Sequence, residues 1–268
     1  MDILITRHGQ TDWNVLKKVQ GKADIDLNEN ELIVNDYIKS QVSVINVDSL
    51  IKNPNFRIKP IAHRVIGAPT AILHKDSFLL ENPYYFGDKR MGIYQGTSRF
   101  LVTKGEEFYD ERLSYKYYTR NVSVNGHIIK NKQANKIIYA SMYQSKIEIY
   151  DGDLNKIKII EGPIELEPQY AIENNEISFK NRIPYAFLNY CTDEESFFLT
   201  YVGNYLDREH KLNDHPNWIL QFDWDGNLKN CYFLDSYILS ISKGQQSNVF
   251  YVTVLNKDKE PILLKLHK

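Results

Sequence analysis

The residues best suited to chemistry lie close to the N-terminus. Arg7 and His8 directly follow a short apolar run at residues 2–6, and Asn14 comes shortly after them. A neutral imidazole can attack phosphorus, while a guanidinium and an amide can donate hydrogen bonds to phosphate oxygens. The apolar run predicts a buried strand. This stretch therefore predicts a strand that presents a nucleophilic histidine beside two phosphate-binding side chains.

Residues 1–33 resemble the opening of the histidine phosphatase (phosphoglycerate-mutase-like) superfamily. The resemblance rests on Arg7-His8-Gly9 after the apolar run, on Asn14, and on the segment at residues 21–27. It implies that His8 is the nucleophile that becomes phosphorylated and that Arg7 and Asn14 bind phosphate. It also implies a second arginine, a second histidine and a carboxylic acid, all held by a sheet covered with helices.

Three downstream residues occur in the order that this family requires, namely Arg64, Glu81 and His127. Arg64 is the candidate for the second phosphate-binding arginine. None of the three lies in a motif typical of the family, and residues 34–200 contain few stretches with the periodicity of a long helix. We therefore favour the interpretation that they are surface or turn residues of a β domain.

Most of the chain follows a different pattern, that of repeated β-hairpins. Residues 145–160 form two apolar-alternating runs around Asp151, Asp153 and Asn155, and residues 218–234 repeat the scheme around Asp223, Asp225 and Asn227. A looser third copy spans residues 90–103. Hairpins repeated in this way favour a β-propeller or another radial or stacked β-array.

Residues 44–268 resemble the TolB-like six-bladed β-propeller family of bacterial envelope proteins. The resemblance rests on residues 65–80, 135–143 and 221–227, and on a degraded form of the family's glycine-containing turn at residues 104–108. It implies six blades, whereas a length of roughly 225 residues supplies about five blades of the usual size. The apolar residues 3–6 are suited to pair with an exposed edge and close such a ring.

The predicted fold is therefore an all-β propeller with a short N-terminal strand–helix segment. The predicted domains are a histidine-phosphatase-like fragment at 1–35, a linker at 36–43 and a propeller at 44–268, and the polar stretch at 28–42 suits a short helix or linker. The predicted strands are 70–74, 77–80, 91–94, 100–102, 115–119, 136–143, 146–150, 156–160, 187–191, 197–201, 218–222, 231–234, 238–242, 249–254 and 262–266.

Three further groups of residues have a functional and a structural interpretation. The acidic turns have the oxygen spacing of calcium loops but lack the closing glutamate, so hairpin-turn chemistry is favoured and no metal is predicted. His210 and His215 have a spacing that a metal could use, but lie in a predicted solvated loop. The aromatic residues Trp218, Trp224, Tyr201 and Tyr205 suit either a sugar- or peptide-binding face or blade packing, and packing is favoured.

Composition limits the classes of partner. Thirty-three basic and thirty-four acidic residues give a formal net charge of −1, which does not favour binding to nucleic acid or anionic lipid. No stretch has the ~20 apolar residues of a membrane-spanning helix, and no export signal is evident, which favours a cytoplasmic location. The resemblance to the propeller family implies the bacterial envelope instead, so both compartments stay open. Cys191 and Cys231 are not expected to form a disulfide scaffold or a metal site.

Three hypotheses for function follow. The favoured one is a non-catalytic propeller that binds an unknown protein or small molecule at its rim, without a cofactor. The alternative is a histidine-dependent phosphatase or phosphomutase that uses His8, Arg7 and Asn14. The third is a chimera, in which a phosphatase opening has been joined to a propeller and has lost the scaffold that aligned it; a catalytic group misplaced by about 1 Å can already cost on the order of a hundredfold in rate.

Overall fold

The computed structural model describes residues 31–36, 41–53, 60–63, 68–74, 77–81, 91–95, 99–104, 126–131, 134–173, 176–180, 182–207, 217–244, 249–256, 258 and 260–267. The chain divides into two compact units. The first consists of Met1–Phe86 and Met91–Thr103, and the second of Gly87–Arg90 and Lys104–Lys268.

The described part of the first unit consists of two antiparallel sheets and one short helix. The order within the sheets is β1-β2-β3 and β4-β5-β6-β7. The strands are β1 (Glu31–Asp36), β2 (Gln41–Asn46), β3 (Pro60–His63), β4 (Ala68–His74), β5 (Ser77–Glu81), β6 (Met91–Gln95) and β7 (Arg99–Lys104). The expectation of a helix or linker at 28–42 is therefore wrong for residues 31–36 and 41–42, which are in strands β1 and β2.

The helix α2 (Val47–Lys52) begins where an asparagine caps it. The Asn46 side chain accepts a hydrogen bond from the Ser49 backbone N–H at 2.9 Å, which satisfies one of the donors left open at a helix start. The helix is six residues long. Across the ranges that the structure describes, no helix has both the length and the apolar character needed to cross a lipid bilayer.

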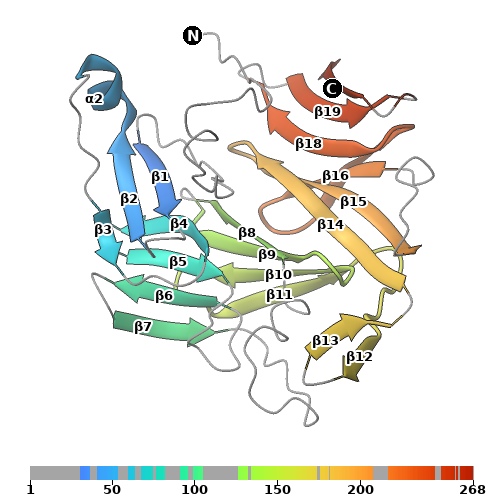
Figure 1. Ribbon diagram of the computed structural model, residues 1–268, viewed down its shortest axis with the longest axis horizontal. Coiled ribbons are helices and arrows are strands. Elements are labelled where there is room, and N and C mark those ends of the chain that lie inside the picture. The colour runs from blue at the N-terminus through green and yellow to red at the C-terminus, as the bar shows by residue number, and fades with distance from the viewer. Residues whose placement is uncertain are drawn as a thin grey trace. The chain divides into compact units, whose positions relative to one another are not determined.

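The described part of the second unit is built almost entirely from strands that pair with their neighbours in the sequence (Figure 1). The sheet orders are β8-β9-β10-β11, β12-β13, β14-β15-β16-β17 and β18-β19-β20. The strands are β8 (Gly126–Asn131), β9 (Lys136–Ser141), β10 (Lys146–Asp151), β11 (Lys156–Glu161), β12 (Tyr170–Glu173), β13 (Glu176–Phe179), β14 (Arg182–Thr192), β15 (Ser196–Asp207), β16 (Asn217–Asp223), β17 (Leu228–Leu234), β18 (Ile238–Lys243), β19 (Val249–Leu255) and β20 (Pro261–His267).

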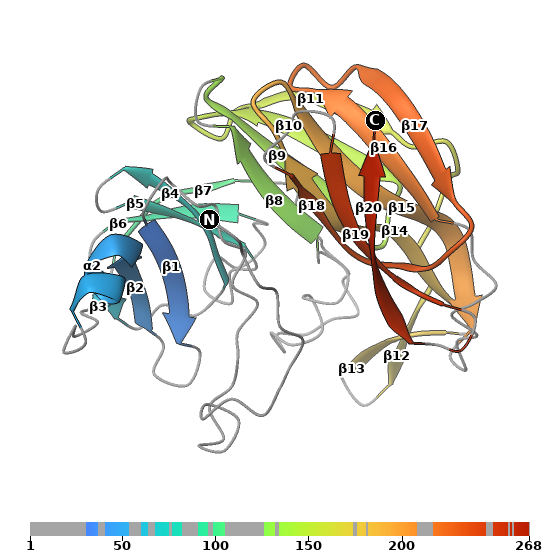
Figure 2. The same ribbon diagram turned by 90° about the horizontal axis from the view of Figure 1, so that it is seen from above.

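Burial follows the position of each strand within its sheet. The middle strands β9 and β10 are buried over nearly their whole length, whereas the terminal strands β11, β17 and β20 are largely exposed. Figure 2 shows β17 on the outer side of its sheet. A strand buried on both faces needs a continuous run of apolar residues, as Ile137–Ala140 provides in β9. A strand with an exposed face can alternate apolar residues with lysines, as β11 does.

The core of the second unit fills the spaces between successive sheets. One cluster joins β8–β11 to β14–β17, and within it the ring of Phe197 stacks on Phe222 at 5.2 Å between centroids. A second cluster joins β14–β17 to β18–β20, where Phe198 meets Phe250 edge-on at 4.7 Å. Full burial of such a side chain contributes about 1.5–3 kcal/mol. Phe197 and Phe222 are register partners on adjacent strands of one sheet, whereas the contact between Phe198 and Phe250 joins two neighbouring sheets.

Two polar contacts add to this packing. The hydroxyls of Ser145 and Tyr201 are 2.7 Å apart and both residues are buried, and the backbone N–H of Ala186 donates to the carbonyl of Met142 at 2.8 Å. Each contact joins the loop after β9 to strands of the next sheet. Packing and hydrogen bonds therefore act at the same sheet-to-sheet boundary.

The predicted fold class is confirmed: the chain is all-β and propeller-like, with antiparallel sheets that follow one another along the sequence. The predicted strands within the described ranges are present, with boundaries shifted by a few residues, and β2 coincides with the β-prone run expected from residue 42 onward. Strands β1, β3, β8, β12 and β13 were missed. The looser hairpin at 90–103 corresponds to the neighbouring strands β6 and β7. The N-terminal strand–helix segment and the strand at 115–119 lie outside the described residues.

Candidate functional site at the acidic hairpin turns

The turn between β10 and β11 is organised by the carboxylate of Asp151. One of its oxygens accepts hydrogen bonds from the backbone N–H groups of Asp153 at 3.0 Å and Asn155 at 2.8 Å, and the other accepts from the Asn155 side-chain amide at 3.0 Å. The Leu154 backbone N–H donates to the Asp151 carbonyl at 3.1 Å. Leu154 has a φ of 61°, which places the αL residue where a three-residue hairpin loop requires it.

The turn between β16 and β17 repeats this geometry. The Asp223 carboxylate accepts from the backbone N–H groups of Asp225 at 3.0 Å and Asn227 at 2.8 Å, and from the Asn227 side-chain amide at 3.0 Å. Here the αL position is Gly226, with a φ of 78°. The sequence match between the two hairpins therefore reports a shared three-dimensional turn, and the hairpin-turn interpretation of both acidic motifs is confirmed.

A third turn of the same type lies between β19 and β20, where sequence reasoning did not place one. The Asn256 side-chain oxygen accepts from the backbone N–H groups of Asp258 at 2.9 Å and Glu260 at 2.8 Å, and its amide group donates to the Glu260 carboxylate at 3.3 Å. The amide and the carboxylate have exchanged positions relative to the other two turns. The sequence signal was the same five-residue spacing of polar side chains, from Asn256 to Glu260. It was missed because the amide comes first and the carboxylate last, the reverse of the other two turns.

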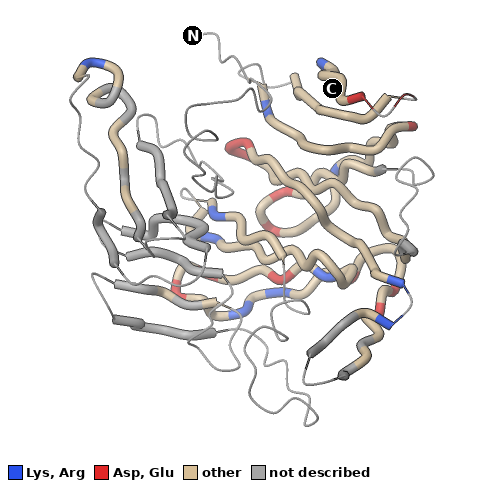
Figure 3. Tube along the Cα trace, in the orientation of Figure 1, with Lys and Arg blue, Asp and Glu red and all other residues tan. Residues whose placement is uncertain are grey.

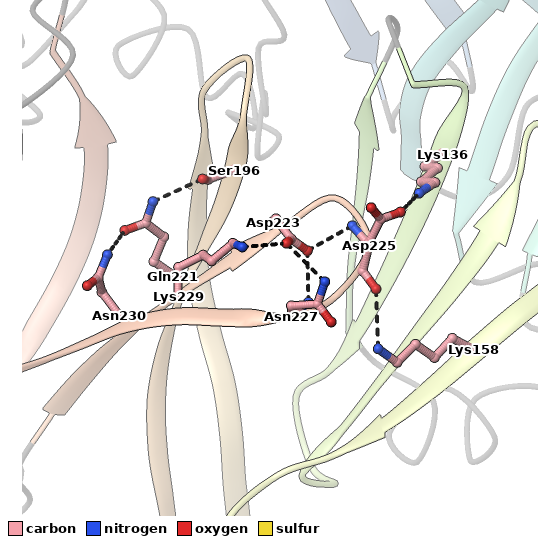
Figure 4. A network of polar contacts seen from close by, with 9 residues as sticks. All are labelled: Lys136, Lys158, Ser196, Gln221, Asp223, Asp225, Asn227, Lys229 and Asn230. Atoms are coloured by element: carbon pink, nitrogen blue, oxygen red, sulfur yellow. Dashed lines mark hydrogen bonds and ion pairs between the residues drawn. The ribbon is translucent and has the colours of Figure 1, made fainter.

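The Asp223–Asn227 turn also contacts the neighbouring sheet (Figure 4). Lys136 of β9 forms an ion pair with the Asp225 carboxylate, and the Lys158 ammonium of β11 donates to the Asp225 carbonyl at 3.3 Å. A Cβ atom added to Gly226 would lie 2.5 Å from side-chain methyl groups of Ile149 and Ile160. The turn is thus fitted against sheet β8–β11 and links it to β14–β17.

Asp223 is the most strongly perturbed carboxyl group of this turn. Its side chain forms an ion pair with Lys229 at 3.0 Å. Partial burial acts to raise its pKa, but the hydrogen bonds from Asn227 and Lys229 and the charge of Lys229 prevail and hold the pKa of Asp223 well below its usual range. Because its oxygens are already engaged by these donors, this carboxylate is suited to hold the turn rather than to act as a base.

A buried polar network continues along β16 from this turn. The Gln221 side-chain amide donates to the Ser196 hydroxyl at 2.9 Å, and its oxygen accepts from the Asn230 amide at 2.7 Å (Figure 4). The same oxygen also accepts from the Tyr232 hydroxyl at 3.3 Å. Gln221 and Ser196 are buried. This network satisfies a buried amide across three strands of one sheet, which is a structural role.

Sequence reasoning also missed a charged cluster on β10. Glu148 is fully buried, with the Tyr150 hydroxyl donating to it and the ammonium groups of Lys146 and Lys156 at 4.0 and 3.7 Å. Side chains two residues apart on a strand share a face, so the order Lys146, Glu148, Tyr150 was the available signal. A buried carboxylate with cationic and hydroxyl partners is stabilised against the cost of desolvation.

The four aromatic residues considered for a binding face have different environments. Trp224 is buried and its indole N–H donates to the Glu194 carbonyl at 3.1 Å, and Tyr201 is buried against Ser145. The Tyr205 hydroxyl accepts from the Glu167 N–H at 2.9 Å. For these three the packing interpretation is confirmed. Trp218 alone is 36% exposed and lies beside Phe233, 51% exposed, at 4.9 Å between ring centroids.

Few of the residues proposed for phosphoryl transfer lie in the described ranges. Arg7, His8, Asn14 and Arg64 are outside them, as are His210 and His215. Glu81 ends β5.

His127 lies on β8 with its ring 5.4 Å from that of Tyr190. Within the described ranges no group of three histidine, cysteine or acidic residues is arranged to hold a metal ion.

The N-terminal segment of the chain is similar to a known protein family. Residues 3–33 match the Histidine phosphatase superfamily (branch 1). This match supports the resemblance of the N-terminal segment and does not extend to the strands of the second unit. No curated protein matches the chain.

Three solved structures that resemble this chain share little of its sequence. A member of the duf4221 family from Bacteroides vulgatus shares 10% identity, with 89% of this chain and 75% of that chain covered and a TM-score of 0.51. A chain of a nidogen/laminin complex shares 12% identity, with 91% and 78% covered and a TM-score of 0.48. Apo AztD from Citrobacter koseri shares 9% identity, with 90% and 70% covered and a TM-score of 0.44. The first of these likenesses shows a shared fold and nothing about function.

Proposed function

We propose that this protein is a non-catalytic binding protein built on a propeller of the TolB-like, six-bladed type. Antiparallel sheets of four, four and three strands, packed against one another through apolar clusters in the second unit, support this proposal. Such a scaffold presents strand edges and turns in fixed positions. The partner is a protein or small molecule that binds at the rim formed by the outer strands.

The observation that carries the proposal is the exposed aromatic pair on the outer part of sheet β14–β17. Trp218 and Phe233 are partners in the register of β16 and β17, and both rings remain partly exposed. Large aromatic rings contribute most when they are buried, and they are enriched at the centre of protein interfaces. An exposed pair on a rigid sheet is therefore suited to be covered by a partner.

The polar groups of the described sheets serve the scaffold instead. Asp223 holds a turn, Gln221 connects strands, and Asp225 links two sheets. The donors that engage the Asp223 carboxylate and the Gln221 amide support a structural role for these two side chains.

The second candidate function is phosphoryl transfer, which the family match at residues 3–33 favours. In that case the His8 imidazole attacks the phosphorus of a phosphate monoester, and Arg7, Asn14 and Arg64 stabilise charge on the phosphate oxygens. The leaving group departs as an alcohol after protonation, and water then hydrolyses the phosphohistidine. This function requires a second histidine and an acid near His8.

One experiment separates the two candidates. The full chain is incubated with a generic phosphate monoester, in parallel with His8→Ala and with His267→Ala, which removes an exposed histidine of β20 as a matched control. We expect the three proteins to show the same background rate. Turnover that is lost in His8→Ala and kept in His267→Ala, together with acid-labile phosphohistidine, would overturn the proposal in favour of the phosphatase.

A further inference from the structure

The exposed terminal strands of the second unit differ in how well their edges are protected. A strand at the edge of a sheet offers unpaired N–H and C=O groups to any extended chain, and natural proteins block such edges with lysine or proline. In the described chain, β11, β17 and β20 each end a sheet and are largely exposed. Their sequences therefore show which edge is open to a further strand.

Two of the three edges carry blocking residues. Strand β11 contains Lys156 and Lys158, and strand β20 begins with Pro261, which has no N–H, and contains Lys265. Basic and acidic positions are interspersed over the sheets of the second unit (Figure 3). A charge directly opposite a docking strand must lose water when that strand binds, which disfavours binding.

The third edge has no such protection over most of its length. Strand β17 carries one charge, Lys229, and that ammonium is held by the Asp223 carboxylate at 3.0 Å. The segment Asn230–Leu234 is uncharged, and Asn230, Cys231 and Phe233 are exposed. We propose that the outer edge of Asn230–Leu234, called here the open edge, binds an extended, uncharged segment of a partner protein as an added β-strand.

The side chains beside the open edge define what that segment carries. Phe233 packs on Trp218 of the adjacent strand, so an added strand would place one side chain next to this aromatic pair. Cross-strand pairs of aromatic and apolar or β-branched residues stabilise sheets. The recognised segment therefore has apolar or β-branched residues at alternate positions, while main-chain hydrogen bonds supply affinity that does not depend on its sequence.

The size of the open edge favours a peptide segment over a second copy of this chain. Five residues span about 17 Å. A stable interface of standard size takes roughly 20–30 residues on each side, whereas the open edge consists of the residues Asn230–Leu234. A single extended segment, in contrast, fits this length and needs no further surface. This inference rests on the proposed binding function and specifies the chemistry of the partner.

The test uses a fluorescently labelled, capped peptide of alternating valine and threonine, and binding to the full chain is measured by anisotropy. Two isomeric peptides carry N-methyl groups on the odd or on the even residues, so each blocks the N–H groups of one side only. We expect the unmodified peptide to bind and one isomer to bind at least about tenfold more weakly, because two or more hydrogen bonds are lost. The other isomer should bind like the unmodified peptide.

Protein variants locate the site. Phe233→Lys places a charge at the open edge, and Cys231→Lys does so at a second exposed position, in case the first variant does not fold. Leu263→Lys is the matched control, since Leu263 is 59% exposed on β20. Binding should fall about tenfold or more in either open-edge variant and stay unchanged in Leu263→Lys.

Several outcomes would overturn the inference. They are equal binding of both N-methylated isomers, an equal loss in Leu263→Lys, or no binding of the unmodified peptide at millimolar concentration. A concentration-dependent dimer that Phe233→Lys abolishes would identify a second copy as the occupant instead. The His8→Ala comparison is independent of all these results, so failure of the proposed function and failure of this inference are distinguishable.

Discussion

Replacement of Asp223 by alanine is expected to destabilise the second unit measurably. The substitution removes the acceptor for two backbone N–H groups, at 3.0 and 2.8 Å, and for the Asn227 amide at 3.0 Å. It also removes the ion pair with Lys229. The two backbone donors then lose the partner that fixes the turn between β16 and β17.

The magnitude follows from the kind of contact that is lost. A side-chain acceptor that caps backbone donors contributes about 1 kcal/mol, with a range of roughly 0.5–2, and bonds to a charged acceptor lie at the upper end. The ion pair contributes little, because Lys229 is 51% exposed. We expect a loss of about 2 kcal/mol in the free energy of unfolding for Asp223→Ala.

Urea unfolding followed by tryptophan fluorescence measures this loss, since the buried Trp224 lies in the turn itself. Lys229→Met is the control that removes the ion pair and keeps the turn, and it should cost less than about 0.5 kcal/mol. A larger cost for Lys229→Met than for Asp223→Ala would refute the reasoning, because the ion pair and not the turn would then dominate.

Three further predictions concern single residues. The pKa of Asp223 is depressed in the folded protein. The stabilising effect of this carboxylate is therefore present above its ordinary pKa of 3.8 and is lost as the pH falls toward its folded-state pKa. The difference in the free energy of unfolding between wild type and Asp223→Asn should be larger at about pH 7 than at about pH 3. Gly226→Ala should lower the free energy of unfolding by about 1–2 kcal/mol, because φ is 78° at this position and an added Cβ would meet two isoleucine methyl groups. Asparagine adopts a positive φ more readily than alanine, so the backbone part of this loss should be smaller in Gly226→Asn, and urea unfolding measures both variants. Burial raises the pKa of Cys191 to about 12, while Cys231 is exposed, so a disulfide reagent should label Cys231 in the folded protein and Cys191 only after unfolding.

Much of the second unit could be predicted from its sequence, because its strands are short, apolar and separated by polar turns. The pairing of β10 with β11 and of β16 with β17 followed from two matching hairpin motifs. Strands β8, β12 and β13 were missed. The expectation of a helix or linker at 28–42 failed at β1, where the mostly polar composition concealed the apolar residues Leu32–Val34.

The candidate site was predictable only in part. The side chains that form the Asp223 turn were visible as a motif, but its contact with Lys136 joins residues far apart in the sequence and depends on how two sheets pack. The burial of Glu148 likewise depends on tertiary packing and could not be read from the sequence around it. The distinction between Trp218 and Trp224 also required the fold, since both lie on or beside one strand and only one is buried.

Amide hydrogen exchange at β17 tests the central claim most directly, namely that this β scaffold binds a partner along an unprotected strand edge. The full chain is compared with and without a saturating amount of the alternating valine–threonine peptide. Slower exchange is predicted at alternate amides of Leu228–Leu234, with no change at β11 or β20. Unchanged exchange at β17, or equal protection of all three edges, would contradict the account.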